Sequence, residues 1–126
     1  MKNGITKKEL MQVYYLNREI MNDTEELVEL KIRMREKLED DEDAVEIIRK
    51  HEKRIVEKIR KCSEIKERAM NFINSIEDSL TRQVFYYRFV KSMPWKRVAY
   101  MTGGCNTEEG VRKIAERYLK REGESR

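Results

Sequence analysis

Apolar residues recur at alternating steps of three and four in two long stretches of this chain. The first stretch follows a signal for the start of a helix. Thr6 stands three residues before Glu9, as in a capping box, and Ile5 can pack against Leu10 as a hydrophobic staple. Steps of three and four place residues on one face of a helix, so the spacing predicts helices over residues 7–38 and 43–76. The predicted apolar stripes are Val13, Leu16, Ile20, Leu27, Leu30 and Met34 in the first helix, and Val45, Ile48, Ile55, Ile59, Cys62, Ala69, Ile73 and Ile76 in the second.

Five consecutive acidic residues, 39–43, separate the two stretches. Because like charges repel, we expect a short turn here, with Asp41 as the N-cap of the second helix. Two helices of matching length joined by a short turn predict an antiparallel hairpin over residues 1–76. Each stripe is narrow and is interrupted by polar residues such as Asp23, so we expect a homodimer in which a second copy covers the hairpin. The alternative is a monomer, in which the next helix folds back over the stripe.

The segment after the hairpin has the spacing of a helix-turn-helix. Asp78 is a candidate N-cap for an aromatic helix that runs through Lys91, and this helix is apolar on two sides, so it must be sandwiched. Pro94 can begin the next helix, because a missing N–H costs nothing at the first helical position. Gly103 or Gly104 provides the positive φ that the turn requires.

The last helix is predicted to begin at the Asn106-Thr107 pair, with Asn106 as its cap and Glu109 completing the cap. The two helices of the motif are predicted to bury Trp95, Val98 and Met101 and then Val111, Ile114, Ala115, Tyr118 and Leu119. Facing outward are Lys96 and Arg97, followed by Glu108, Arg112, Lys113, Glu116, Arg117, Lys120 and Arg121.

Positive charge is concentrated on this segment. Residues 82–121 contain ten Lys or Arg and three Asp or Glu, whereas the rest of the chain contains eighteen basic and twenty-one acidic residues. A structural cap for a coiled coil needs no such asymmetry. An outer helix face rich in Arg and Lys is instead what entry into the major groove of DNA requires.

Residues 76–121 resemble the helix-turn-helix of sigma factor region 4. The residues that carry the resemblance are an Asp before a short aromatic helix, the Arg88-Phe89 pair, Trp95-x-x-Val98-Ala99, a Gly turn and Val111-Arg112. The segment resembles still more the form of this module in small phage transcriptional regulators of Gram-positive bacteria, of the late-gene and autolysin-regulator types, where a helical arm precedes it.

The resemblance implies a DNA-binding fold and a role in the transcription of phage or mobile-element genes, and leaves open a contact with RNA polymerase. It matches Trp95, Val98, Ala99 and Val111 to positions that hold the fold, and Thr107, Arg112 and Lys113 to positions that face DNA. The predicted DNA-binding residues are therefore Lys96, Arg97, Asn106, Thr107, Glu108, Arg112, Lys113, Glu116, Arg117 and Lys120.

One departure concerns the turn. Ala99 and Val111 lie twelve residues apart, which is longer than in typical sigma modules, and Gly110 falls in the first turn of the last helix. Glycine costs about 1 kcal/mol relative to Ala inside a helix. Either the backbone at Gly110 approaches another group closely, or the helix begins later than Asn106 indicates.

The composition restricts the remaining choices. With 41% charged and 39% hydrophobic residues, the chain favours long, surface-rich helices over a thick core. Cys62, Cys105 and His51 match no metal-ligand spacing, no glycine-rich phosphate loop follows a strand, and no apolar run approaches the length of a membrane span. We therefore expect no cofactor, no enzymatic activity and no membrane contact.

No signal-peptide pattern opens the chain, and two reduced thiols fit the cytoplasm. The predicted architecture is all-α, with a hairpin over residues 1–76, a helix-turn-helix over residues 77–121 and a disordered tail over residues 122–126. The predicted function is sequence-specific DNA binding in transcription. The alternatives are a small subunit of a phage DNA-packaging terminase and a purely structural coiled coil.

Overall fold

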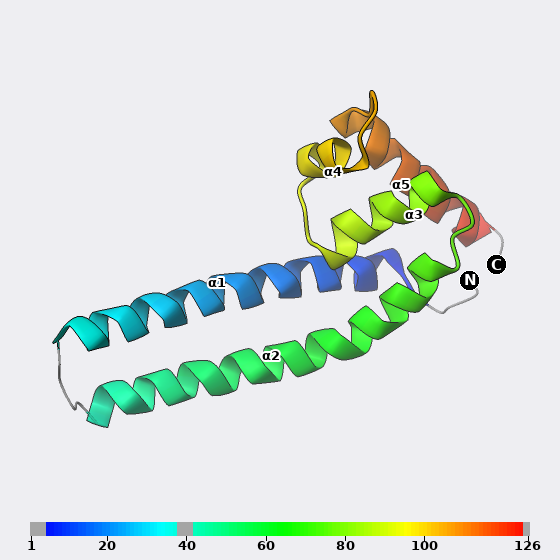
Figure 1. Ribbon diagram of the computed structural model, residues 1–126. Coiled ribbons are helices and arrows are strands. Elements are labelled where there is room, and N and C mark those ends of the chain that lie inside the picture. Colours follow the sequence, from blue (N-terminus) through cyan, green and yellow to red (C-terminus); the bar gives the residue numbers. More distant parts are fainter. Residues whose placement is uncertain (1–4, 38–41, 125–126) are drawn as a thin grey trace.

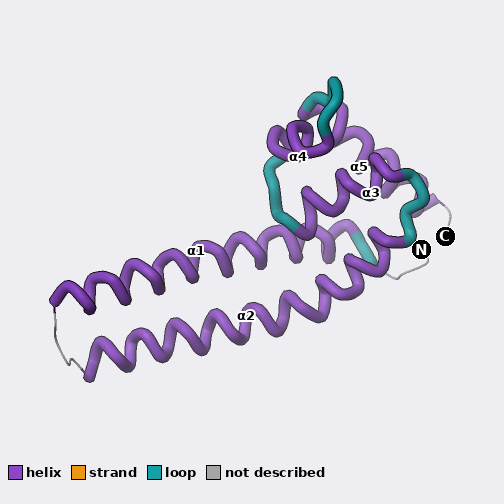
Figure 2. The backbone as a smooth tube through the Cα atoms, viewed as in Figure 1, coloured by secondary structure: helices purple, strands orange, loops and turns teal. Residues whose placement is uncertain are grey.

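The computed structural model describes residues 5–37 and 42–124, and all of the regular structure in these ranges is helical. Helices α1 (Lys7–Lys37) and α2 (Glu42–Asn74) lie antiparallel as a long hairpin (Figure 1). They are followed by α3 (Ser79–Phe85), a π-helical turn η1 (Tyr86–Val90), α4 (Trp95–Thr102) and α5 (Glu108–Glu124). The last four elements form a C-terminal module, residues 78–124, that sits on one end of the hairpin (Figures 1 and 2). The predicted all-α class is confirmed.

Several predicted boundaries differ from the structure. Helix α2 ends at Asn74 rather than Ile76, because Ser75 and Ile76 donate their N–H groups three residues back and tighten the last turn. Helix α5 continues to Glu124, so the predicted disordered tail is wrong for residues 122–124. Of the turn predicted at residues 39–43, residues 42 and 43 belong to α2. Leu38, the Asp41 cap and residues 39–41 lie outside the described residues.

The predicted start of α1 is confirmed. The Thr6 hydroxyl accepts a hydrogen bond from the Glu9 N–H at 3.1 Å, and the Glu9 carboxylate accepts one from the Thr6 N–H at 3.2 Å. Ile5 and Leu10 are fully buried on either side of this capping box. Glu9 also pairs with Arg68 of α2, which joins the start of α1 to the second helix.

The contact between α1 and α2 follows a seven-residue repeat. In α1 the predicted stripe faces α2, from the buried Val13 to the half-buried Met34. In α2 the prediction is partly wrong, because Val45 and Ile59 are 49% and 46% exposed. Helices that wind around each other keep residues seven apart in contact, and this repeat turns the neighbouring Ala44 and Lys58 inward in place of Val45 and Ile59. The α2 residues that face α1 are Ile48, His51, Ile55, Lys58, Cys62, Ile65, Ala69 and Phe72.

Polar groups in this contact find partners within the chain. Lys58 Nζ lies 2.5 Å from Asp23 Oδ2, with both side chains mostly buried. The Cys62 thiol donates a weak hydrogen bond to Asn17 Oδ1 at 3.4 Å, and burial raises the pKa of this thiol. The Asn17 amide in turn donates to the carbonyl of Val90 in η1 at 2.8 Å. These pairs fix the register of the hairpin and tie it to the C-terminal module.

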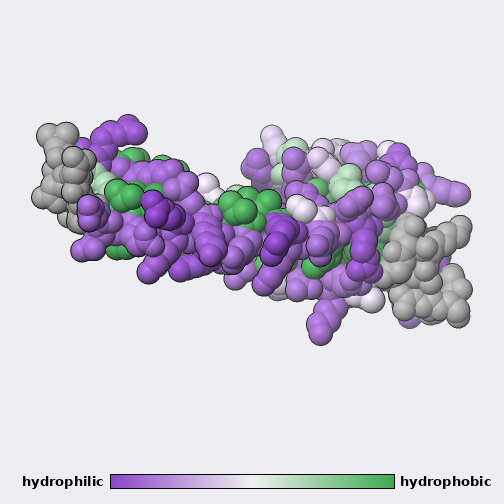
Figure 3. Space-filling view, turned by 90° about the horizontal axis from the view of Figure 1, so that it is seen from below, coloured by the Kyte–Doolittle hydropathy of each residue, from purple (hydrophilic) through white to green (hydrophobic). Residues whose placement is uncertain are grey.

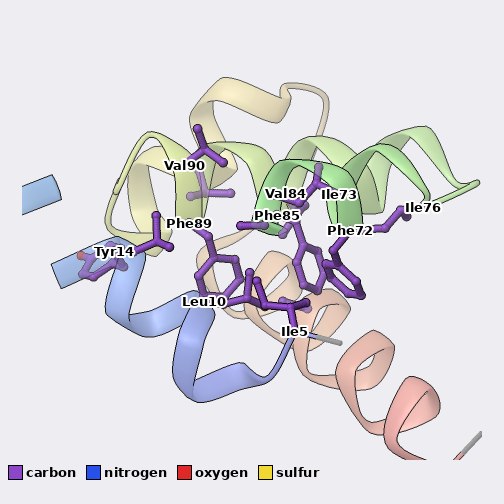
Figure 4. Packing of buried hydrophobic residues seen from close by; sticks show 14 of the residues in the cluster. Ile5, Leu10, Tyr14, Phe72, Ile73, Ile76, Val84, Phe85, Phe89 and Val90 are labelled. Atoms are coloured by element: carbon purple, nitrogen blue, oxygen red, sulfur yellow. The ribbon is translucent and has the colours of Figure 1, made fainter. Parts of the chain in front are cut away.

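One aromatic cluster joins the hairpin to the module (Figure 4). The ring of Phe85 lies 5.8 Å from Phe72, 5.5 Å from Phe89 and 5.5 Å from Tyr118, measured between centroids. Phe72 belongs to α2 and Tyr118 to α5, so α3 is sandwiched between these two helices as predicted. Each such pair stabilises by about 0.5–1.5 kcal/mol beyond the area that it buries.

The aromatic helix does not run unbroken to Lys91. After Phe85 the chain widens into η1, in which the Lys91 N–H donates to the carbonyl of Tyr86, five residues earlier. The extra residue in this turn lets the neighbours Phe89 and Val90 both point inward, at 2% and 8% exposure. The chain then reverses at the buried Ser92, whose φ is +52°.

Acid should weaken the start of α3. The Thr81 hydroxyl and N–H donate to the Asp78 carboxylate at 2.7 and 2.9 Å, which lowers the pKa of Asp78. A carboxyl group with a lowered folded-state pKa stabilises the fold above its unfolded-state pKa. That contribution is lost as the pH falls through the folded-state value. We therefore expect urea unfolding curves to show reduced stability on acidification, and Asp78→Asn to be less sensitive to pH over that range. Equal pH profiles for both proteins would contradict this.

Candidate nucleic-acid interface

Helix α4 is held by a short apolar face. Val98 and Ala99 are buried, and Trp95 and Thr102 are half-buried, so the inward positions are 95, 98, 99 and 102. The predicted inward position of Met101 is wrong, because this side chain lies beyond the edge of that face and is 37% exposed. Pro94 precedes α4 as its N-cap, with φ −65° and ψ 155°, rather than forming its first residue.

The turn between α4 and α5 uses both glycines. Gly103 and Gly104 have φ values of +74° and +65°, which confirms the predicted positive φ. The Asn106 side chain closes the turn, since its Nδ2 donates to the Gly103 carbonyl at 2.8 Å and to the Thr102 hydroxyl at 3.2 Å. The predicted role of Asn106 as the cap of the last helix is therefore wrong.

Thr107 caps α5 instead. Its hydroxyl accepts a hydrogen bond from the Gly110 N–H at 3.0 Å, and the helix begins at Glu108. A Cβ atom at position 110 would lie only 2.9 Å from this hydroxyl oxygen. Gly110 thus leaves room for the cap, and the later helix start also explains the longer turn. Glu109 pairs with Lys113 at 3.1 Å rather than completing a cap with Asn106.

Helix α5 separates apolar from charged side chains. Its inner face consists of the buried Val111 and Ala115 and the half-buried Ile114, Tyr118 and Leu119, as predicted. This face packs against α3 and α4, which fixes the direction of the opposite face. The exposed outer side chains are Glu108, Glu109, Arg112, Lys113, Glu116, Arg117, Lys120 and Arg121.

The ion pairs on this outer face are weak enough for their basic side chains to change partners. Lys113 Nζ lies 3.1 Å from Glu109 Oε1, and Arg112 Nε lies 3.9 Å from Glu116 Oε1. All four side chains are about half exposed, and exposed pairs of this kind contribute only about 0–1 kcal/mol. The basic groups can therefore leave their carboxylate partners for phosphate at little cost.

Arg117 lies at the edge of the charged face. The spacing of four residues between Arg112, Glu116 and Lys120 places these side chains around the centre of the face, with Lys113 beside them. Arg117 instead borders a shallow pocket of about 520 Å³ between α5 and the turn after α2. The pocket also presents the acidic residues Glu77, Asp78 and Glu122.

Helix α4 adds a second exposed surface. Lys96 and Arg97 are exposed as predicted, and Tyr100, one turn later on the same face, is 78% exposed. Sequence reasoning missed Tyr100, although inward positions 98, 99 and 102 leave position 100 outside. Its hydroxyl can donate to a phosphate oxygen. Helix α4 and the start of α5 meet at the end of the module that is remote from the hairpin (Figure 1).

Arg88 joins this surface to the hairpin. Its guanidinium carbon lies 4.1 Å from the ring centre of Tyr14 in α1 and 4.3 Å from that of Trp95 in α4. One of its N–H groups also donates to the Met93 carbonyl at 3.1 Å. Trp95 was predicted to be buried; it is half-buried and stacks on Arg88.

The described residues offer no metal centre, since within residues 5–37 and 42–124 no three His, Cys, Asp or Glu side chains are grouped as ligands. In the same ranges, no helix has both the length and the apolarity that a membrane span requires. Comparisons with protein-family models, curated proteins and solved structures found no match to this chain. The resemblance to sigma region 4 thus stays a prediction from sequence motifs.

Removing the Arg88 contact should loosen α4. We expect Arg88→Ala to lower the free energy of unfolding by about 1–3 kcal/mol, because two cation–π contacts and a hydrogen bond are lost. The emission of Trp95, the one tryptophan in the chain, should shift to the red as water reaches its ring. Arg97→Ala is the control, since Arg97 is exposed on the same helix. Unchanged unfolding and emission in Arg88→Ala would contradict the described contact.

Proposed function

We propose that this protein binds double-stranded DNA through its C-terminal module, with α5 in the major groove, and regulates transcription. The observation that carries the proposal is the outer face of α5. Arg112, Lys113 and Lys120 are exposed on it, while the opposite face is packed into the aromatic cluster. A helix held in this way presents its charged groups in a fixed direction, as a recognition helix must.

The two exposed surfaces suit different parts of a DNA duplex. In helix-turn-helix proteins the first helix crosses the backbone and the second enters the groove with its N-terminal residues. In that arrangement Lys96, Arg97 and Tyr100 contact phosphates. Arg112 and Lys113, in the first turns of α5, reach base edges, and an Arg there can donate two hydrogen bonds to guanine.

The acidic residues of α5 are compatible with this arrangement on DNA. Glu108 lies in the first turn of α5, where a carboxylate can accept a hydrogen bond from the amino group of cytosine. Glu109 and Glu116 pair with Lys113 and Arg112 in the free protein and release them when DNA is bound. Asn106 is committed to the turn and Thr107 to the cap, so these two residues position α5 rather than read bases.

The resemblance to small phage regulators supports a target among phage or mobile-element genes, and RNA polymerase is a candidate second partner. We further propose a cytoplasmic protein without enzymatic activity. The alternative, a small terminase subunit that recognises viral DNA, also fits a helical arm joined to a DNA-binding module. Light scattering on the purified protein separates the two, because packaging subunits assemble into large rings and regulators are usually monomers or dimers.

Affinity for DNA should depend on the first turns of α5. We expect Arg112→Ala combined with Lys113→Ala to weaken binding in gel-shift assays at least tenfold, because two charge-assisted contacts are lost. Helical content and melting should stay unchanged, since the ion pairs of both residues are exposed. The logarithm of the wild-type binding constant should fall with the logarithm of salt concentration, with a slope of about 0.9 per phosphate contact.

The matched control is Arg60→Ala combined with Lys61→Ala. This pair is also adjacent, helical and exposed, but it lies on α2 of the hairpin. It removes the same charge from the chain, so any purely nonspecific effect of net charge appears in both variants. If the α5 variant binds DNA like the wild type, or the α2 variant loses as much affinity, the assignment of α5 as the recognition helix is wrong.

A further inference from the structure

The face of α1 that carries the C-terminal module continues beyond it. Tyr14 is buried under the module, against Arg88. Met21 and Val28 lie seven and fourteen residues after Tyr14, a spacing that keeps residues on one stripe of a supercoiled helix. The module does not reach them, and they are 57% and 50% exposed.

Helix α2 shows the same continuation. Ile73 is buried in the cluster that joins hairpin and module, and Ile59 lies fourteen residues earlier on the same stripe. Val56 likewise lies fourteen residues before Met70, which also packs against that cluster. Both residues are uncovered, at 46% exposure for Ile59 and 64% for Val56.

The two stripes lie side by side. The ion pair between Asp23 and Lys58 sets the register of the hairpin, so that Met21 and Ile59 lie at the same level of the two antiparallel helices. We call Met21, Val28, Val56 and Ile59 the hairpin patch. Seen from below, apolar atoms reach the surface at several places on the hairpin beyond the end that the module covers (Figure 3).

We propose that a second copy of the chain covers the hairpin patch, so that the protein is a homodimer held by its two hairpins. The solvent-accessible surface area of the chain supports a second copy as the partner. A compact monomer of 15.3 kDa exposes roughly 7,100 Å², whereas this chain exposes 8967 Å². The difference exceeds the roughly 800 Å² that each partner loses in a standard interface. The patch is also continuous with the surface on which the module already packs.

The charges of the hairpin fit a copy of itself better than a strongly charged partner. Helices α1 and α2 together contain sixteen basic and fourteen acidic residues. Both signs border the patch, with Glu25 and Lys31 on α1 and Glu52 and Lys53 on α2. In a two-fold interface the same surface meets itself, so a border of mixed sign can pair each charge with its opposite. A polyanion or an anionic membrane would instead require a basic excess.

This interface differs from the one expected from the sequence. The predicted dimer shared the apolar stripes of both helices, but α1 and α2 use most of these residues against each other. Asp23, which interrupts the predicted stripe, has its partner Lys58 in the same chain. Ile59 contributes to the proposed dimer because it lies outside that stripe, on the face that carries the module.

Sedimentation of the full chain tests the proposal. We expect a dimer for the wild type at micromolar concentration, and at least a tenfold weaker dimer for Ile59→Glu. Glu is a good helix former, so helix loss does not explain the effect.

Ile47→Glu is the matched control. Ile47 is an isoleucine of the same helix with nearly the same exposure, 47% against 46%. It lies twelve residues from Ile59, which places it roughly 120–150° away around the helix.

The outcomes separate this proposal from DNA binding. A wild-type dimer that Ile59→Glu dissociates and Ile47→Glu leaves intact supports the hairpin patch. A monomeric wild type, or equal weakening by both substitutions, overturns it. Binding of a single DNA half-site by the Ile59→Glu monomer is measured in parallel. Its loss would count against the proposed function of α5, because the substituted side chain lies on the hairpin.

Discussion

The contact of Phe85 with Phe72 and Tyr118 holds the molecule together. These rings come from α3, α2 and α5, so one buried group fixes the hairpin, the central short helix and the last helix relative to one another. The orientation of α5 follows from this contact, because its inner face has no other place to bury Tyr118 and Val111. The direction of the basic outer face is thus a consequence of aromatic packing. Arg88, between Tyr14 and Trp95, extends the same connection to α4.

Much of this architecture can be predicted from the spacing of apolar residues, because helix periodicity is a local property. The capping box at Thr6, the stripe of α1 and the inner face of α5 all follow from it. The stripe of α2 was partly misplaced because its partner winds around it, and the seven-residue repeat then favours His51 and Lys58 over Val45 and Ile59. The π-helical turn was not predictable from local spacing. It exists because Phe89 and Val90 both have a buried place to occupy, and that place is formed by residues far away in the sequence.

The candidate site, too, was predictable from the sequence only in part. Charge and periodicity were sufficient to place Arg112, Lys113, Glu116 and Lys120 on one exposed face. They were not sufficient to choose between Asn106 and Thr107 as the cap, since both residue types favour that position. Gly110 carried the deciding signal: a glycine three residues after Thr107 provides the space that the capping hydroxyl occupies. Tyr100 was missed because the outer face of α4 was identified by its charged residues, and a tyrosine adds no charge to that pattern.

Charge and apolar surface are separated along the molecule, and this separation lets the two proposed contacts respond differently to the solvent. The C-terminal module carries the basic excess, and binding of phosphates there weakens as salt replaces the counterions that DNA releases. The hairpin is nearly neutral and its patch is apolar, so a contact there depends on removing water from Met21, Val28, Val56 and Ile59. Screening leaves that contribution intact, and excluded salts strengthen it. A dimer of this kind would therefore persist at salt concentrations that release it from DNA.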